Sequence, residues 1–268
     1  MLGAIVGDVI GSRFEAHNIK TKDFNLFSSS SRPTDDTVMT IAIAAALYNH
    51  IRYGEDLAEA AVNNMQMYGL SFSDAGYGGR FIKWLVSEDP QPYNSYGNGA
   101  GMRVSPCAIL ANSLEEALYF CDEVTKVTHN HPEGMKGARA ITAATYLAKI
   151  GASKDEIRDH IQNNYYDLNF SLDDIREDYK FDVSCHGSVP QAIEAFLESE
   201  DFEDAIRNAI SIGGDSDTIA AMSGAIAEAY YGIPLDIQLD VIDHMYDDLL
   251  GVMYDFEALC KWYTIRKE

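Results

Sequence analysis

Two short acidic segments contain the residues best suited to chemistry. They are Thr34-Asp35-Asp36-Thr37 and Asp215-Ser216-Asp217-Thr218. Each supplies two carboxylates together with hydroxyl groups, and neither contains a cysteine or a histidine. Mg²⁺ and Mn²⁺ prefer oxygen ligands of this kind, whereas zinc sites generally use Cys or His. If the two segments lie close together, they would form a site for divalent cations.

Each segment taken alone has a simpler interpretation as a helix cap. Asp and Thr accept hydrogen bonds from the free N–H groups of a first turn and suit the positive end of the helix dipole. However, both segments precede unusual helices, because Thr40–Leu47 and Ile219–Ala227 are apolar on almost every side and rich in small residues. A helix without a polar face is expected to be buried. We therefore expect the two segments to meet in the interior, where protons or cations must relieve their repulsion.

Hydrophobic spacing predicts an all-α fold class. Apolar residues recur at intervals of three and four along much of the chain, as in Leu114–Val124. The expected helices cover residues 37–53, 57–68, 114–128, 133–150, 154–165, 190–198, 202–212, 217–231 and 236–250. No linker rich in Pro, Ser or Gly divides the chain, so we expect one domain over residues 1–268. The predicted architecture is a compact orthogonal multi-helix bundle with a binuclear metal site at its centre.

Composition excludes several classes of protein. The formal net charge is -22, from 42 acidic and 20 basic residues. This charge opposes non-specific binding to nucleic acid or to anionic membranes. The four cysteines show no C-x-x-C pairing, so neither a zinc site nor a disulfide framework is indicated. Neither a signal peptide nor an apolar run of membrane-spanning length is present, and we expect a cytoplasmic protein.

Four separated stretches of the chain resemble the ADP-ribosylglycohydrolase family. They are Gly7–His17, Thr34–Thr37, Ser95–Val104 and Gly213–Thr218, and their order and spacing cover almost the whole chain. The family includes the dinitrogenase-reductase-activating glycohydrolases and the mammalian ADP-ribosylhydrolases. The resemblance implies an all-α fold around two metal ions, with Mg²⁺ expected and Mn²⁺ as the alternative.

The resemblance also implies which residues hold the metals and perform catalysis. It assigns metal ligation to Thr34, Asp35, Asp36, Asp215, Asp217 and Thr218, and catalysis to Glu15, Asp36 and Asp215. Glu15 lies in a stretch similar to the serine-ADP-ribose hydrolase branch and would be a mobile acidic residue near the metals. Its alternative is a surface or capping role beside Arg13. We expect Asp8 to be structural, in a tight turn between glycines.

The segment from Ser95 to Gly101 is the candidate substrate loop. Gly97, Gly99 and Gly101 are expected to leave backbone N–H groups uncovered, an arrangement that suits a diphosphate. Tyr96 offers a ring for stacking and Asn98 an amide, whereas an ordinary glycine-rich turn is the alternative. The resemblance adds Gly79 and His129. The predicted substrate-binding residues are Gly79, Ser95, Tyr96, Gly97, Asn98, Gly99 and His129.

The expected activity is hydrolysis of the bond between C1″ of ADP-ribose and a protein side chain or another acceptor. The expected partner is an ADP-ribosylated protein or a small ADP-ribose conjugate, and we expect a monomer. Two alternatives stay open: an inactive ADP-ribose-binding protein of the same fold, and a metal-dependent hydrolase of the diphosphate. Arginine, serine, ester and nucleic-acid linkages share the recognised ADP-ribose portion, so the linkage also stays open.

Overall fold

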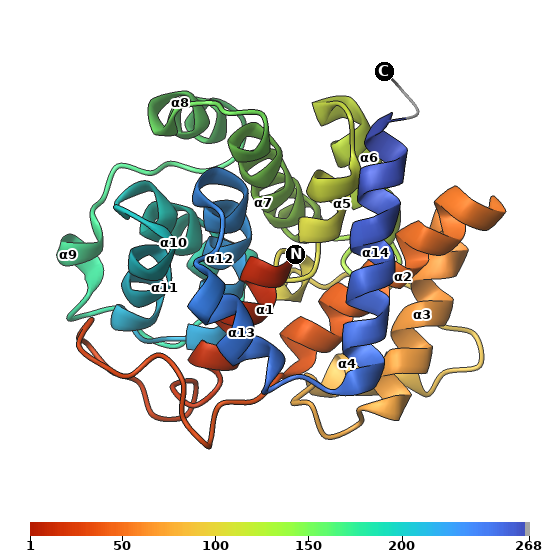
Figure 1. The fold of residues 1–268 in the computed structure, drawn as a ribbon, viewed down its shortest axis with the longest axis horizontal. Coiled ribbons are helices and arrows are strands. Elements are labelled where there is room, and N and C mark those ends of the chain that lie inside the picture. The colour runs from red at the N-terminus through yellow and green to blue at the C-terminus, as the bar shows by residue number, and fades with distance from the viewer. Residues whose placement is uncertain (266–268) are drawn as a thin grey trace.

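The computed structural model describes residues 1–265. Within that range the chain forms fourteen α-helices and one 3-10 helix with no β-strand, which confirms the all-α fold class (Figure 1). The helices are α1 (Leu2–Gly11), α2 (Asp35–Tyr53), α3 (Leu57–Ser71), α4 (Gly79–Leu85), η1 (Asn98–Ala100), α5 (Ser105–Leu110), α6 (Leu114–Lys126), α7 (Pro132–Lys149), α8 (Lys154–Asn164), α9 (Leu172–Ile175), α10 (Cys185–Leu197), α11 (Phe202–Ser211), α12 (Ser216–Tyr231), α13 (Leu235–Ile242) and α14 (Asp247–Ile265). Among the helices of this range, none combines the length and the apolar composition that a bilayer crossing requires.

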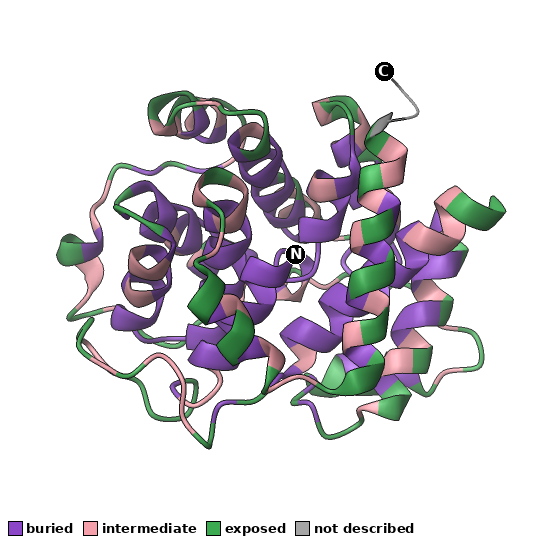
Figure 2. Ribbon diagram, viewed as in Figure 1, coloured by how far each residue is buried: buried purple, intermediate pink, exposed green. Residues whose placement is uncertain are grey.

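Three helices, α1, α2 and α12, form the centre of the molecule. Every residue of α1 is buried, as are residues 36–47 of α2 and residues 216–227 of α12 (Figure 2). Helices α7, α10 and α11 pack against α12, while α3, α5 and α14 pack against α2. The burial expected for the two small-residue helices is therefore confirmed, and both of their acidic starts lie inside the protein.

Helices α1 and α12 approach each other unusually closely. A Cβ atom added to Gly7 would lie 2.1 Å from the carbonyl oxygen of Ala220, and one added to Gly3 would lie 2.2 Å from that of Gly224. These glycines and Gly11 are four residues apart and share one helix face. Because glycine has no side chain, the two backbones can touch along this face. The contact brings the side chain of Asp8 next to the start of α12.

Two expected helices differ from the structure by more than three residues at a boundary. The predicted helix 236–250 is wrong, because the chain turns between Ile242 and Asp247. Helix α13 packs against α1, whereas α14 packs against α2 and α5, so one straight helix cannot reach both partners. The helix expected to begin at Pro190 begins at Cys185, where the Ser184 side chain accepts a hydrogen bond from the N–H of Gly187. Pro190 therefore lies inside α10.

Candidate metal centre and substrate cavity

The two acidic helix starts meet at the centre of the protein. Thr34 caps α2 by accepting a hydrogen bond of 3.3 Å from the N–H of Asp36. Asp215 occupies the N-cap position of α12 after Gly213 and Gly214, whose φ angles of 68° and 75° favour glycine. The hydroxyl of Thr218 donates a hydrogen bond of 3.1 Å to Oδ2 of Asp36. The convergence expected from the sequence is thereby confirmed.

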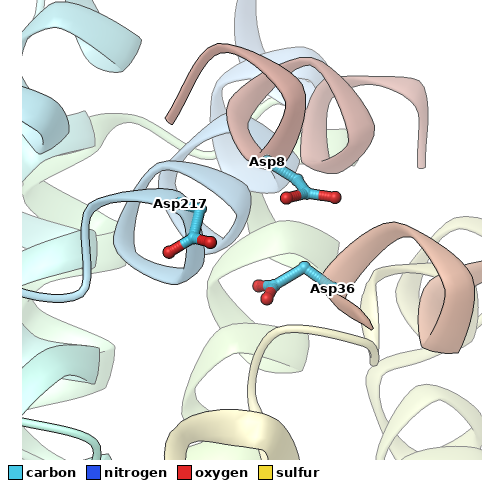
Figure 3. Close-up of side chains that lie close together, drawn as sticks. All are labelled: Asp8, Asp36 and Asp217. Carbon is cyan, nitrogen blue, oxygen red and sulfur yellow. The ribbon is translucent and has the colours of Figure 1, made fainter. Parts of the chain in front are cut away.

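The carboxylates form two adjacent groups. Asp8 from α1, Asp36 from α2 and Asp217 from α12 point toward a common space (Figure 3), and each offers an oxygen within 4.8 Å of the others. Glu15, Asp215 and Asp217 form the second group by the same measure. Asp217 belongs to both groups. Each group contains enough carboxylate oxygens to hold a metal ion.

The charges of these groups are poorly compensated by the protein. Burial, followed by the charge of a neighbouring carboxylate, raises the pKa of Asp36 and of Asp217 well above the usual value. Burial and the charge of Asp8 raise the pKa of Asp35 to about 7. None of the ion pairs within residues 1–265 involves these carboxylates. Oδ1 of Asp36 is also buried without a hydrogen-bond partner in the described structure. An all-oxygen set with an unsatisfied atom fits a divalent cation.

Asp8 connects α1 to the first turn of α2. It accepts hydrogen bonds from the N–H and hydroxyl of Thr34, at 2.9 Å and 2.7 Å, and from the N–H and hydroxyl of Thr37. These bonds agree with a structural role, but the expected tight turn is wrong because Asp8 lies within α1. The glycines on either side of it serve helix packing. Asp8 therefore both anchors α2 and contributes to the first carboxylate group.

Five of the six predicted metal ligands line one cavity, namely Asp35, Asp36, Asp215, Asp217 and Thr218. Thr34 is not among the lining residues. Its hydroxyl donates to Asp8 while its oxygen accepts from the N–H of Asp36. The structure thus gives Thr34 a capping role, and metal ligation by Thr34 stays a prediction.

Glu15 follows α1 on an exposed segment and lines the same cavity. Partial burial, together with the charges of Asp215 and Asp8, raises the pKa of Glu15. Asn18 attaches the segment to the turn before Asp215, because it donates to the carbonyl of Gly214 at 2.9 Å and accepts from the N–H of Gly214 at 2.8 Å. Arg13 instead donates to the carbonyl of Asn25. Within residues 1–265 no ion pair joins Glu15 to Arg13, and the alternative of a surface or capping role for the exposed Glu15 stays open.

The cavity has a volume of about 450 Å³, within the range of small-molecule sites. Of the predicted substrate-binding residues, those that line it are Gly79, Ser95, Gly97, Asn98, Gly99 and His129. Asn98 also donates a hydrogen bond of 2.7 Å to Oδ2 of Asp215, which links the loop to the second carboxylate group. Tyr96 is not among the lining residues. Its exposed ring lies edge-on to His131, with 5.4 Å between the ring centroids.

The expected row of open N–H groups is only partly present. The N–H of Gly97 donates to Oγ of Ser95 at 3.2 Å, and that of Gly101 donates to the carbonyl of Asn98 at 2.7 Å. Within residues 1–265 the N–H of Gly99 has no such partner. The expectation was therefore wrong for Gly97, whose N–H is taken by the Ser95 hydroxyl, and for Gly101, whose N–H closes the 3-10 turn.

Several cavity residues were missed by the sequence reasoning. Tyr93, Arg103, Phe181 and Val183 all line the cavity. Phe181 and Val183 are exposed and lie in the polar segment before α10, and the carbonyl of Val183 accepts a hydrogen bond of 2.8 Å from the N–H of Asn98. The sequence did offer one signal for this part of the cavity wall, because Phe181 and Val183 are apolar residues within a charged segment that has no helical periodicity.

Comparison with known proteins shows the family of this chain. ADP-ribosylhydrolase ARH3 of Xenopus tropicalis is 27% identical to this chain, over 89% of each sequence. ADP-ribosylarginine hydrolase Tri1 of Pseudomonas putida is 25% identical, over 87% of this chain and 70% of its own. A solved structure of an ADP-ribosylglycohydrolase-related protein complex has the same fold, with a TM-score of 0.69, 21% identity and coverage of 97% of this chain and 95% of its own. The family model for ADP-ribosylglycohydrolase matches residues 1–265. The chain therefore belongs to the ADP-ribosylglycohydrolase family.

Proposed function

We propose that this protein is a metal-dependent hydrolase that cleaves the C1″ glycosidic bond of ADP-ribose attached to a protein side chain or another acceptor. The observation that carries the proposal is the convergence of the two acidic helix starts in the wall of a cavity that is also lined by Ser95 and Gly97–Gly99. Family membership and the named activities of ARH3 and Tri1 support the same reaction class.

The residues that would hold two Mg²⁺ or Mn²⁺ ions are Thr34, Asp35, Asp36, Asp215, Asp217 and Thr218. When bound, the metals would supply Lewis acidity, a template for the hydroxyl groups of the distal ribose, and activation of water. The unpartnered Oδ1 of Asp36 and the uncompensated charge of the cluster support this assignment. Asp8 would act on the centre by fixing the first turn of α2.

Glu15 would act as the base in the hydrolytic step. Its carboxylate lies beside Asp215 and Asp217, and its pKa is raised toward the range in which a carboxylate accepts a proton usefully. The oxygen of water bonds to C1″ as the bond from C1″ to the acceptor atom breaks. One proton of the water passes to Glu15 and is then delivered to the leaving acceptor atom, which regenerates the Glu15 carboxylate. Nearby carboxylate oxygens would stabilise the positive charge that develops on the ribose.

The rest of the cavity would recognise ADP-ribose. Asn98 bridges the two regions, since its amide contacts Asp215 and its backbone belongs to the loop. Gly99 and His129 would contribute donors to the diphosphate, and Tyr93 and Phe181 would offer apolar surface to the remainder of the ligand. Substrate contacts of Tyr96 would require its exposed ring to turn toward the cavity.

A panel of substrates tests the proposal. Purified protein would be incubated with Mg²⁺ and arginine-linked, serine-linked, ester-linked or nucleic-acid-linked ADP-ribose, and the products separated by chromatography. Free ADP-ribose from at least one substrate is the expected product, and it also assigns the linkage. Release of AMP would instead identify a diphosphate hydrolase. Binding of ADP-ribose without cleavage of any conjugate would identify an inactive member of the fold.

A further inference from the structure

Arg103 is a buried cation to which the proposed reaction assigns no role. It is 1% exposed and lines the cavity, yet its Nε has no hydrogen-bond partner in the described structure. None of the ion pairs within residues 1–265 involves it. Burying a guanidinium without a carboxylate partner costs free energy, so we expect Arg103 to have a function that accounts for its position. Burial lowers the pKa of Arg103 to about 10, which still leaves it charged at neutral pH.

The hydrogen bonds of Arg103 lead directly to His129. Nη2 of Arg103 lies 2.6 Å from the hydroxyl oxygen of Thr128 and 3.4 Å from Nδ1 of His129. The same Thr128 oxygen lies 2.8 Å from Nδ1 of His129. A guanidinium can only donate, so the Thr128 oxygen accepts from Arg103 and its own proton is free to go to Nδ1. The contact between Arg103 and Nδ1 therefore requires Nδ1 to be an acceptor, and the hydroxyl of Thr128 can donate to the same nitrogen.

The opposite nitrogen of His129 faces the substrate loop. A Cβ atom added to Gly97 would lie 3.7 Å from Nε2 of His129, and one added to Gly99 would lie 3.5 Å from it. Nε2 has no hydrogen-bond partner within residues 1–265. Burial and the charges of Arg103 and Arg80 lower the pKa of His129 well below its usual value, so the ring is neutral and carries a single proton.

We propose that Arg103 is a positioning residue that acts through Thr128 to hold His129 as the Nε2–H tautomer, so that this N–H donates to an anionic phosphate oxygen of the substrate. The identity of that oxygen rests on the proposed function. The loop itself offers little to a diphosphate, since the N–H groups of Gly97 and Gly101 are already engaged. His129 Nε2–H and the N–H of Gly99 would form the available pair of donors.

The tautomer can be measured without any ligand. Long-range ¹H–¹⁵N correlation spectra of ¹⁵N-labelled protein distinguish Nε2–H, Nδ1–H and doubly protonated rings, and loss of one signal set in His129→Phe assigns His129. The expected result for the parent is a neutral ring protonated on Nε2. An Nδ1–H ring or an imidazolium at neutral pH would overturn the proposal, and this measurement requires no variant of Arg103.

Two variants of Arg103 distinguish its hydrogen-bonding role toward Thr128 and His129 from a role in packing alone. Arg103→Lys keeps a group that can only donate, whereas Arg103→Met keeps much of the volume but cannot donate. We expect Arg103→Lys to retain the Nε2–H tautomer and Arg103→Met to populate the Nδ1–H form. An unchanged tautomer in a folded Arg103→Met protein would rule out the positioning role. If Arg103→Met does not fold, an Nδ1–H ring in the parent or in Arg103→Lys would still overturn the proposal.

A double-mutant cycle tests whether the effect reaches the ligand through His129. Calorimetry with ADP-ribose should show affinity at least about tenfold weaker for His129→Phe, the worth of one hydrogen bond to a charged acceptor. Arg103→Met should weaken binding at least about threefold in the parent and less than about twofold in the His129→Phe background. Equal losses in both backgrounds would mean that the charge of Arg103 acts directly on the ligand. If the protein shows the predicted tautomer but does not bind ADP-ribose, the positioning of His129 by Arg103 would be supported and the proposed function would be contradicted.

Discussion

The hydroxyl of Thr218 donates a hydrogen bond of 3.1 Å to the carboxylate of Asp36, across 182 positions of the sequence. This bond joins the first turn of α12 to the first turn of α2. It occupies Oδ2 of Asp36 and leaves the buried Oδ1 without a partner in the described residues. The two acidic segments are thus parts of one site, and helix capping alone does not account for an unsatisfied carboxylate oxygen.

Removing this hydroxyl should damage the site more than the fold. In Thr218→Val the side chain keeps its shape but loses its donor and the oxygen that we propose as a metal ligand. We expect kcat to fall about tenfold or more and the free energy of unfolding to fall by about 1 kcal/mol. Steady-state kinetics and urea denaturation measure the two effects. Thr218→Ser, which keeps the hydroxyl, is the matched control, and equal activity of the Val and Ser variants would contradict a role for this oxygen.

The contact between α1 and α12 should not tolerate a methyl group. In Gly7→Ala the new Cβ would lie 2.1 Å from the carbonyl oxygen of Ala220, and backbone atoms cannot move away without shifting a helix. We expect a loss of at least about 3 kcal/mol in the free energy of unfolding. Gly251→Ala is the matched control, because Gly251 is an exposed helical glycine with no atom within 4 Å of the added Cβ. It should gain about 0.5–1 kcal/mol.

The stability of the protein should carry a pH dependence that arises from His129. Burial lowers the pKa of His129 in the folded state, so below about pH 6.5 the unfolded chain binds a proton that the folded chain does not. Stability is therefore lost as the pH falls through this range, by about 1 kcal/mol between pH 7 and pH 5.5. Urea denaturation of the parent and of His129→Gln at both pH values measures this contribution. Identical pH dependence in the two proteins would show that His129 is protonated equally in both states.

The acidic centre could be predicted from the sequence because its cause is local. Two helices of small apolar residues had to be buried, and each began with a cluster of carboxylates. The sequence therefore predicted that both clusters lie in the interior of the protein. The role of Asp8 was harder to predict, since the three glycines of α1 suggested a turn rather than a face packed against α12. A glycine in a turn and a glycine on a packed helix face look alike in the sequence, and only the position of the partner helix distinguishes them.

The substrate loop was less predictable because its details depend on distant residues. Gly97 and Gly99 line the cavity whereas Gly101 does not, and hydrogen bonds within the loop occupy the N–H groups of Gly97 and Gly101. Tyr96 projects outward because its carbonyl binds the N–H of Cys185 and its ring lies against His131. Phe181 and Val183 enter the wall through a non-periodic segment. These outcomes follow from tertiary contacts that spacing along the chain does not encode.

The most direct test of the metal centre combines chelation with calorimetry. Parent protein freed of divalent ions by EDTA and gel filtration would be titrated with Mg²⁺ and with Mn²⁺, and release of ADP-ribose from the active conjugate would be followed in the same samples. We predict no turnover without metal, full recovery on adding Mg²⁺ or Mn²⁺, and loss of both metal binding and turnover in Asp36→Ala and Asp215→Ala. Full activity in excess EDTA, or wild-type metal binding by both variants, would contradict the account.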